Sequence, residues 1–513
     1  MITKTFGAAI YGVNAKMISI EVNIVQGTNL YVVGLPDSSI KESQHRIESV
    51  LKNIHFEMPR QRVIVNLAPA DIKKEGSADD LPIALSILQA SRQCVFSNLE
   101  EYVILGELAL DGVLRPIKGV LPITIEAKKM GLKTFLLPAE NAQEAAIVEE
   151  IDIIPIKHIS EAIDFLSGKI NISPIKINVK EITEKVLTKY DLDFADVQGQ
   201  EGVKRALEIA AAGGHNLLMV GPPGAGKTML AKRLSTILPA MTMEEALETT
   251  KIYSVAGELP AGRLISSRPF RSPHHTISNV ALVGGGTNPH PGEISLAHNG
   301  VLFLDELPEF KRSVLEVMRQ PLEERKIIVS REKITVAFPA NFMLVASMNP
   351  CPCGFYNHPT KECVCSPCTV QKYLNKISGP LLDRIDLHVQ VTPVSYDEIS
   401  RRRSVSKSCE IRERVEKARE IQLKRFKDIK MENIYTNAMM SSNMIKELCI
   451  ISNTANIMLK NAMERLGLSG RAYSKVLKVA RTIADLEASE NILDEHIAES
   501  IRFRGLDRKN WGQ

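Results

Sequence analysis

The chain has 513 residues, of which 44% are hydrophobic and 24% are charged, and its formal net charge at pH 7 is +4. This length predicts two to four domains, and the composition is typical of a soluble globular protein. The mild positive charge permits a nucleic-acid partner but does not argue for one. The sequence has no apolar run near the ~18 residues that a membrane helix needs and no leader-like N-terminus. We therefore expect a cytoplasmic protein rather than a membrane protein.

Residues 1–168 have the pattern of a first α/β domain. Strand-like runs such as Ile18–Val22 and Arg62–Leu67 alternate with helical stretches such as Ile40–Leu51. The stretches Gly106–Gly112 and Arg115–Ile117 resemble the proteolytic domain of the Lon family, which has a ribosomal-S5-domain-2-like fold.

The Lon family places a serine and a lysine at two fixed positions of this domain. The segment 74–80 is similar to the one that carries the serine, but here Ala78 takes its place, and Leu121 takes the place of the lysine. A shift of one residue offers Ser77, again without a matching lysine. Because a hydroxyl needs an adjacent base to attack a peptide, we predict an inactive domain that binds or assembles something.

Residues 169–190 are rich in Lys, Asn and Ile without a strong period, which predicts a linker. A second α/β domain is expected over residues 191–394. Its opening segment, Asp193–Gln200, precedes a predicted helix over 202–212 and resembles the segment that AAA+ ATPases place over the adenine.

A glycine-rich stretch follows the apolar strand Leu217–Val220 and precedes a helix. It matches the phosphate-loop pattern G-x-x-x-x-G-K-[ST] in the required strand–loop–helix setting, over Gly221, Pro222, Pro223, Gly224, Ala225, Gly226, Lys227 and Thr228. The glycines let successive N–H groups point at a phosphate, and the helix N-terminus adds partial positive charge. We predict that Lys227 reaches the β- and γ-phosphates of ATP and that Thr228 holds Mg²⁺.

A second apolar strand, Val301–Leu304, ends in Asp305 and Glu306. Ligands bind at the carboxyl ends of strands in open α/β sheets, so Asp305 is predicted to help hold Mg²⁺ and Glu306 to deprotonate the attacking water. Between the two strands, residues 258–299 form a polar, glycine-rich insertion. Its adjacent His274 and His275 either ligate a metal or serve only as hydrogen-bonding groups.

Three further polar residues match positions of AAA+ proteins. Asn349 follows the third strand-like run, at 342–347, and occupies the sensor-1 position, where an amide can contact the γ-phosphate or the water. Arg384 lies in a Leu-Leu-Asp-Arg stretch that carries the arginine finger in magnesium-chelatase-like AAA+ proteins. Arg471, in a Ser-Gly-Arg stretch, resembles sensor 2, within a helical lid expected over residues 395–513.

Five of the eight cysteines crowd between positions 351 and 368. In a chain without a secretion signal such a cluster indicates metal binding or reduced thiols rather than disulfides. A tetrahedral structural Zn²⁺ would take Cys351, Cys353, Cys363 and Cys365, with Cys368 as a possible substitute. The paired C-x-C spacing is tighter than usual, so free loop thiols remain the alternative.

The order of these features resembles the ComM (YifB) family of magnesium-chelatase-like ATPases over essentially the whole chain. Further matching stretches lie at 211–216, 270–275 and 349–354. The resemblance implies an ATP-driven hexameric DNA helicase that promotes branch migration during natural transformation, with recombination proteins as further partners. It also implies that the segment 274–288 of the insertion contacts DNA, and the charges of Arg268 and Arg271, just before this segment, are compatible with contacts to the DNA backbone. The alternatives are a protein-remodelling ATPase of the chelatase type and an ATP-dependent protease.

Overall fold

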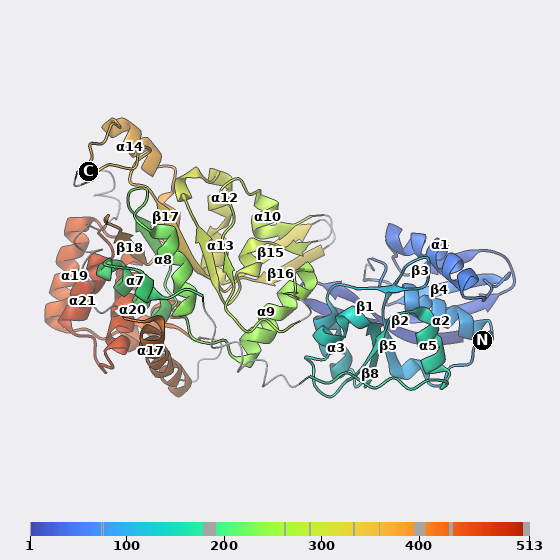
Figure 1. The fold of residues 1–513 in the computed structure, drawn as a ribbon. Helices are drawn as coiled ribbons and strands as arrows, with labels where there is room; N and C mark the ends of the chain where they lie inside the picture. The colour runs from blue at the N-terminus through green and yellow to red at the C-terminus, as the bar shows by residue number, and fades with distance from the viewer. Residues whose placement is uncertain are drawn as a thin grey trace. The chain divides into compact units, whose positions relative to one another are not determined.

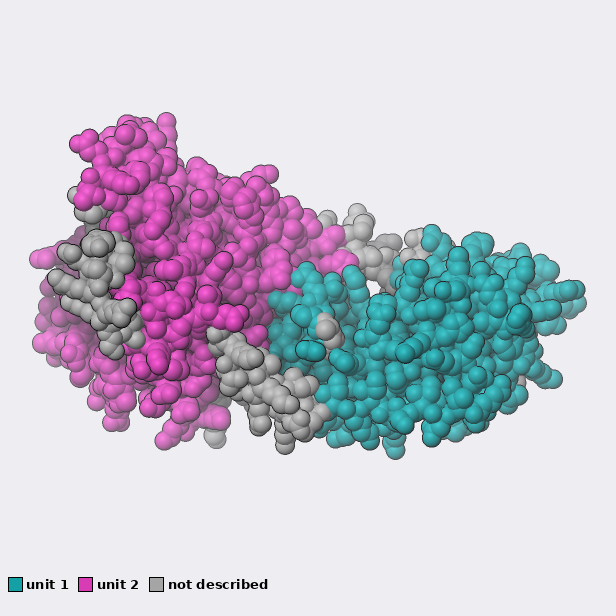
Figure 2. All heavy atoms as spheres, in the orientation of Figure 1, with its two compact units in different colours: residues 1–186, 242–266 teal, residues 187–241, 267–513 magenta. Residues whose placement is uncertain are grey.

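The computed structural model describes residues 2–72, 74, 76–177, 191–260, 263–286, 289–331, 334–358, 360–393, 406–429 and 434–505. They form two compact units, coloured separately in Figure 2: residues 1–186 with 242–266, and residues 187–241 with 267–513. Most of the predicted linker (178–190), the last residue of the predicted second α/β domain (394) and the start of the predicted lid (395–405) lie outside the described residues. Within the described ranges, no helix is long and apolar enough to cross a membrane.

A mixed seven-stranded sheet, in the order β3-β4-β2-β1-β5-β8-β9, organises the first unit (Figure 1). The larger strands are β1 (Ile2–Tyr11), β2 (Asn14–Val25), β3 (Leu30–Val33), β4 (Arg62–Ala68), β5 (Tyr102–Ile104), β8 (Thr134–Pro138) and β9 (Asp152–Ile156), and the pair β6 (Glu107–Leu108) and β7 (Leu114–Arg115) forms a separate hairpin. In β4 the side chains of Val63, Val65 and Leu67 alternate into the core, as the sequence predicted.

The helices of this unit are α1 (Ser38–Asn53), α2 (Asp80–Ala90), α3 (Val120–Lys129), α4 (Ala142–Ala145), α5 (Ile159–Leu166) and α9 (Met243–Ala256). Helix α9 comes from far along the chain. The N–H of Gly119 donates to the carbonyl of Ser254 at 3.1 Å, and the Ser254 hydroxyl donates to Glu144 at 2.5 Å. A segment that follows the phosphate loop in sequence therefore packs with the N-terminal residues, and no local sequence pattern predicted this packing.

The segment aligned with the Lon serine contains a buried polar cluster. The Ser77 hydroxyl donates to the carboxylate of Glu107, and the ammonium of Lys74 donates to the carbonyl of Pro69. Ser77 and Lys74 are thus engaged with other groups rather than with each other. Next to them, Asp79 is buried, and its Oδ1 has no hydrogen-bond partner among the described residues.

Burial raises the pKa of Asp79 from 3.8 to about 7, with the charge of Asp80 acting in the same direction and Lys74 opposing it. The folded unit therefore binds this proton more tightly than the unfolded chain, and its stability falls as the pH rises from about 4 to about 7. The shift corresponds to roughly 4 kcal/mol at most. We expect Asp79→Asn to remove much of this fall, measured as the melting temperature between pH 5 and pH 8.

The exposed Asp152, in the same unit, supplies the control. Asp152→Asn should reproduce the wild-type pH profile. If Asp79→Asn also kept the full pH dependence, Asp79 would not be the responsible group.

The second unit is built on a parallel five-stranded sheet in the order β11-β14-β17-β10-β18 (Figure 1). The strands are β11 (Phe270–Arg271), β14 (Val301–Leu304), β17 (Met343–Met348), β10 (Leu217–Val220) and β18 (Leu387–Gln390). Leu217 and Met219 pack into one apolar cluster, and Leu218 and Val220 into another. Both faces of the sheet are therefore covered, which explains the uninterrupted apolar runs in the sequence.

Helices α7 (Glu201–Gly213), α8 (Lys227–Arg233), α17 (Ser408–Asp428) and α20 (Gly470–Leu486) contribute to the first of these clusters. The second is completed by the remaining core helices: α10 (Asn279–Val283), α11 (Glu293–Leu296), α12 (Arg312–Val317), α13 (Arg319–Glu324), α14 (Pro367–Leu374) and α15 (Gly379–Leu382). Two hairpins are separate from the five-stranded sheet: β12 (Gly284–Gly285) with β13 (His290–Pro291), and β15 (Lys326–Arg331) with β16 (Ile334–Pro339). The second hairpin was missed in the sequence.

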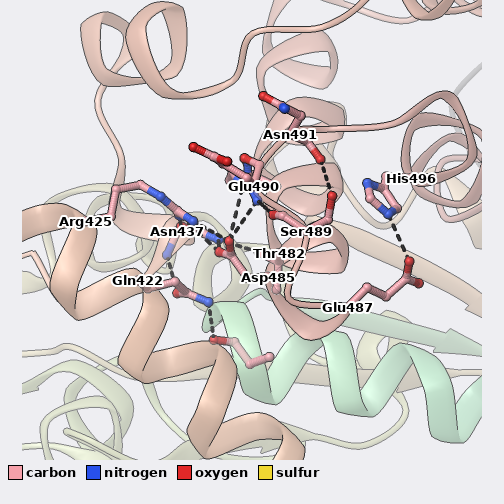
Figure 3. A network of polar contacts seen from close by, with 12 residues as sticks. Gln422, Arg425, Asn437, Thr482, Asp485, Glu487, Ser489, Glu490, Asn491 and His496 are labelled. Atoms are coloured by element: carbon pink, nitrogen blue, oxygen red, sulfur yellow. Dashed lines mark hydrogen bonds and ion pairs between the residues drawn. The ribbon is translucent and has the colours of Figure 1, made fainter.

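The C-terminal part is helical, as predicted, and adds α18 (Ser442–Leu448), α19 (Asn453–Leu466) and α21 (Asp494–Arg502) to α17 and α20. The buried Asp485 of α20 links this helix to α17 and to the turn Asn437–Met439, because it accepts hydrogen bonds from Arg425 and Asn437, both labelled in Figure 3. It also accepts one from Arg481, one turn earlier in α20. Gln422 extends the network to the carbonyl of Ala212, at the end of α7, at 3.1 Å. The lid is thus tied to the helix that precedes the phosphate loop.

Candidate functional site

The phosphate loop leaves the sheet at Gly221 and enters α8 at Lys227. Gly224 and Gly226 have φ angles of +78° and +82°, in the left-handed region that favours glycine. A side chain at Gly221 would collide with the backbone of Val391, since a Cβ there would lie 2.3 Å from its carbonyl oxygen. These glycines are therefore required by the backbone path of the loop.

The ammonium of Lys227 lies inside this loop. It donates to the carbonyls of Gly221 at 2.7 Å and Pro222 at 3.0 Å, and to Oδ1 of Asn349 at 3.0 Å. Burial lowers the pKa of Lys227, while the carboxylates of Asp305 and Glu306 oppose that effect. The predicted phosphate lysine and the predicted sensor amide are thus in direct contact.

Asp305 lies at the carboxyl end of β14, and β17 lies between this strand and β10, which leads into the phosphate loop. Its Oδ2 accepts a hydrogen bond from the Thr228 hydroxyl at 2.7 Å, and its Oδ1 accepts one from Ser347. The oxygen atoms of the two predicted Mg²⁺ ligands therefore lie next to each other, and oxygen ligands suit that ion. Ser347 was missed, although it is a polar residue in the otherwise apolar strand β17.

Glu306 follows Asp305 with a φ angle of +53°, an unusual left-handed conformation for a non-glycine residue. Its N–H donates to Oδ1 of Asp305 at 3.0 Å, and its half-exposed carboxylate lies 3.9 Å from Nδ1 of His275. The rings of His274 and His275 are tilted by 35° relative to each other, with centroids 4.0 Å apart. Nδ1 of His274 lies 3.0 Å from the Thr276 hydroxyl, so this histidine makes a contact of the kind that the hydrogen-bonding interpretation expects.

Arg384 follows α15 and is largely buried. Its guanidinium forms an ion pair with Glu323, at the end of α13, at 2.6 Å and donates to the carbonyl of Pro380 at 2.6 Å. Glu323 was not identified in the sequence. In this single chain the predicted finger is held by its own subunit rather than lying beside Lys227.

Arg471 is the second residue of α20 and its side chain is exposed. No hydrogen bond within the described chain joins it to the Lys227 group. One turn later, the Lys475 ammonium donates to Asp386 and, at 3.0 Å, to the carbonyl of Arg384. Burial alone would raise the pKa of Asp386, but Lys475 and His215 outweigh it and hold that pKa far below its usual range. Helix α20 thus contacts the backbone that carries the predicted finger.

Arg268 and Arg271, which precede the segment 274–288 of the insertion, both contact other groups of this chain. Arg271 forms a two-pronged ion pair with Glu293, at 2.6 and 2.7 Å. Arg268 donates to the carbonyls of Pro239 and Asn299, at 2.7 and 2.8 Å. Both guanidinium groups therefore contact groups of the same chain. Their charges no longer support the predicted DNA contact at these two positions.

Four cysteines converge after β17. The Sγ atoms of Cys351, Cys353, Cys363 and Cys365 all lie within 4.8 Å of one another, and three of the distances are 3.3, 3.5 and 3.7 Å. A tetrahedral Zn²⁺ with Zn–S bonds of about 2.3 Å requires sulfur atoms about 3.8 Å apart. The four thiols fit such an ion, and Cys368, which is exposed, is not part of the cluster.

A parallel sheet with a phosphate loop at one strand and an acidic pair at another, followed by a helical lid, defines an AAA+ type of ATPase. Three family models match the chain: "Magnesium chelatase, subunit ChlI" over residues 193–399, "Subunit ChlI of Mg-chelatase" over 20–141 and "Magnesium chelatase, subunit ChlI C-terminal" over 405–504.

Competence protein ComM of Haemophilus influenzae is 44% identical over 505 residues, which cover 98% of this chain and 97% of the relative. The Escherichia coli protein YifB is 43% identical over 98% of this chain and 96% of its own length. Lon protease 2 of Bacillus subtilis is 27% identical over 179 residues, 31% of this chain and 32% of that protein. The chain belongs to the ComM/YifB family of magnesium-chelatase-like AAA+ proteins.

Proposed function

We propose that this protein is an ATP-driven, ring-forming motor that acts on DNA, a helicase that promotes branch migration when DNA is integrated during natural transformation or recombination. The convergence of Lys227, Thr228, Asp305 and Asn349 at one edge of the parallel sheet carries the ATPase part of the proposal. The DNA part is supported by the full-length similarity to a relative named as a competence protein. Action on DNA implies work in the cytoplasm, as expected from the sequence.

In this mechanism Lys227 exchanges its contacts with the loop carbonyls for the β- and γ-phosphates of ATP. Thr228 and Asp305 would hold Mg²⁺, and the bound ion would supply positive charge against the phosphate oxygens. Glu306 takes the proton of the attacking water, and Asn349, already bound to Lys227, orients the γ-phosphate or that water.

The site is completed by two arginines. Arg471, at the start of α20, closes over the nucleotide from the lid. Arg384 leaves Glu323 and reaches the γ-phosphate bound by a neighbouring subunit, where a guanidinium stabilises charge in the transition state. A finger acting on a neighbour requires a closed ring, and a homo-hexamer is the form that we propose.

Beside ATP and Mg²⁺, we propose a structural Zn²⁺ held by Cys351, Cys353, Cys363 and Cys365. The support for it is the close approach of the four Sγ atoms in a chain whose cysteines are all free. The ion would fix the loop that follows Asn349.

The decisive experiment measures ATP hydrolysis with no DNA and with single-stranded, duplex or branched DNA. We expect stimulation by single-stranded or branched DNA, ATP-dependent branch migration, and a DNA affinity that falls steeply as salt rises, because phosphate contacts release counterions. Absence of DNA binding at low salt with ATP and Mg²⁺ would overturn the DNA motor.

That outcome would favour the alternative, a protein-remodelling ATPase that works through partner proteins. The observation behind this alternative is the match of all three family models to magnesium chelatase. Stimulation of ATP hydrolysis by a co-purifying protein, with no response to any DNA, would be its signature.

A further inference from the structure

The cysteine cluster lies directly against the nucleotide site. Cys351 is completely buried and follows Asn349 by two positions. The N–H of Gly354 donates to the carbonyl of Cys351 at 3.0 Å, and the N–H of Tyr356 donates to its Sγ at 3.3 Å. Residues 349–356 therefore form a tight turn that begins at the sensor amide and wraps around a cluster sulfur.

The same turn touches the phosphate loop. Gly354 has a φ angle of +85°, and a Cβ placed on it would lie 2.4 Å from Cδ and 2.7 Å from Cγ of Pro223. Only a residue without a side chain allows this approach. At the other end of the turn, Asn349 accepts the hydrogen bond from Lys227. One short turn thus contacts the phosphate loop at two points, Pro223 and Lys227.

We infer that a Zn²⁺ bound by Cys351, Cys353, Cys363 and Cys365 positions the phosphate loop, so that occupancy of the metal site sets the affinity of the protein for ATP. The inference rests on the proposed ATPase function. The two cysteine pairs are separated by nine residues, and metal bonds to all four thiolates close that polar loop onto the turn. Without the metal, Gly354 and Asn349 lose the anchor that holds them against Pro223 and Lys227.

Three variants separate this role from a general effect on folding. Cys365→Ser removes a metal ligand without touching the phosphate loop. Gly354→Ala keeps all four thiols, but its Cβ meets Pro223 and strains the left-handed backbone of the turn. Cys368→Ser is the matched control, because this exposed cysteine lies outside the cluster.

The measurements are zinc per chain, the Kd for a fluorescent ATP analogue with Mg²⁺, and the circular dichroism of the full-length protein. We expect about one zinc per chain in the wild type and in Cys368→Ser, with equal Kd values. In Cys365→Ser we expect loss of the zinc and a Kd raised at least about tenfold, with the fold retained. Gly354→Ala should keep its zinc and still bind the analogue more weakly. Treating the wild-type protein with a chelator should raise its Kd, and added Zn²⁺ should restore it.

A wild-type protein that carries no zinc after growth and purification with zinc present would overturn the inference. So would an unchanged Kd after chelation, because the metal would then be present without acting on the loop. Should Cys365→Ser fail to fold, chelation of the folded wild type and Gly354→Ala still decide the matter. A wild-type protein that binds zinc but no ATP would overturn the proposed ATPase function, and that result is distinct from the other two.

Discussion

Replacing Glu306 with glutamine is expected to leave ATP binding intact and to lower hydrolysis by about 10²–10⁴-fold, because an amide cannot take the proton of the attacking water. The backbone conformation at this position is fixed by the N–H contact with Asp305, which glutamine retains. Kd for ATP and single-turnover phosphate release are the two measurements. Lys227→Ala should instead weaken binding itself.

Glu309→Gln is the matched control. Glu309 lies three positions further along, is exposed, and pairs with Lys376 at 3.4 Å. Its loss should leave both binding and hydrolysis near the wild-type values. Hydrolysis at the wild-type rate in Glu306→Gln would show that another group is the base, and loss of ATP binding would point to a structural role for the Glu306 charge.

The parts of the fold that the sequence predicted are those whose signals are local. The phosphate loop couples an apolar strand to a glycine-rich turn and a helix within about a dozen residues, so its pattern needs no information from elsewhere in the chain. The same holds for β14 with its terminal acids and for the helix that begins near Arg471. The cysteine cluster also follows from short spacings, and its four sulfurs do converge.

What the sequence did not predict depends on contacts between distant segments. Ser347 meets Asp305, and Glu323 meets Arg384, across separations of 42 and 61 residues in sequence. Helix α9 packs on N-terminal residues although the pattern around it belongs to the second α/β domain. Hairpin β15–β16 is short, and its sequence has no strong hydrophobic periodicity. Tertiary packing decides which distant residues come into contact, and the intrinsic strand or helix propensities of the residues do not encode this.

Arg384→Ala is expected to be nearly inactive by itself, with hydrolysis lowered about 10³-fold, because the proposed finger supplies a guanidinium that stabilises charge in the transition state. Mixed with Lys227→Ala protein, it should regain activity. In a randomly mixed ring about a quarter of the interfaces pair an intact pocket with an intact finger from the neighbouring subunit. The measurement is the ATP hydrolysis rate across mixing ratios, with a maximum expected near equal amounts.

Arg465→Ala provides the control, since this exposed arginine at the end of α19 should leave the rate unchanged alone and in mixtures. Arg384 forms an ion pair with Glu323 at 2.6 Å in its own chain. To act on a neighbour, the guanidinium must leave this carboxylate before it reaches the neighbouring subunit's phosphate. If mixtures showed only the sum of the two inactive proteins at every ratio, Arg384 would act within its own chain. Its contact with Glu323 would then be a structural ion pair. An active site formed within one chain would give no support for a closed ring.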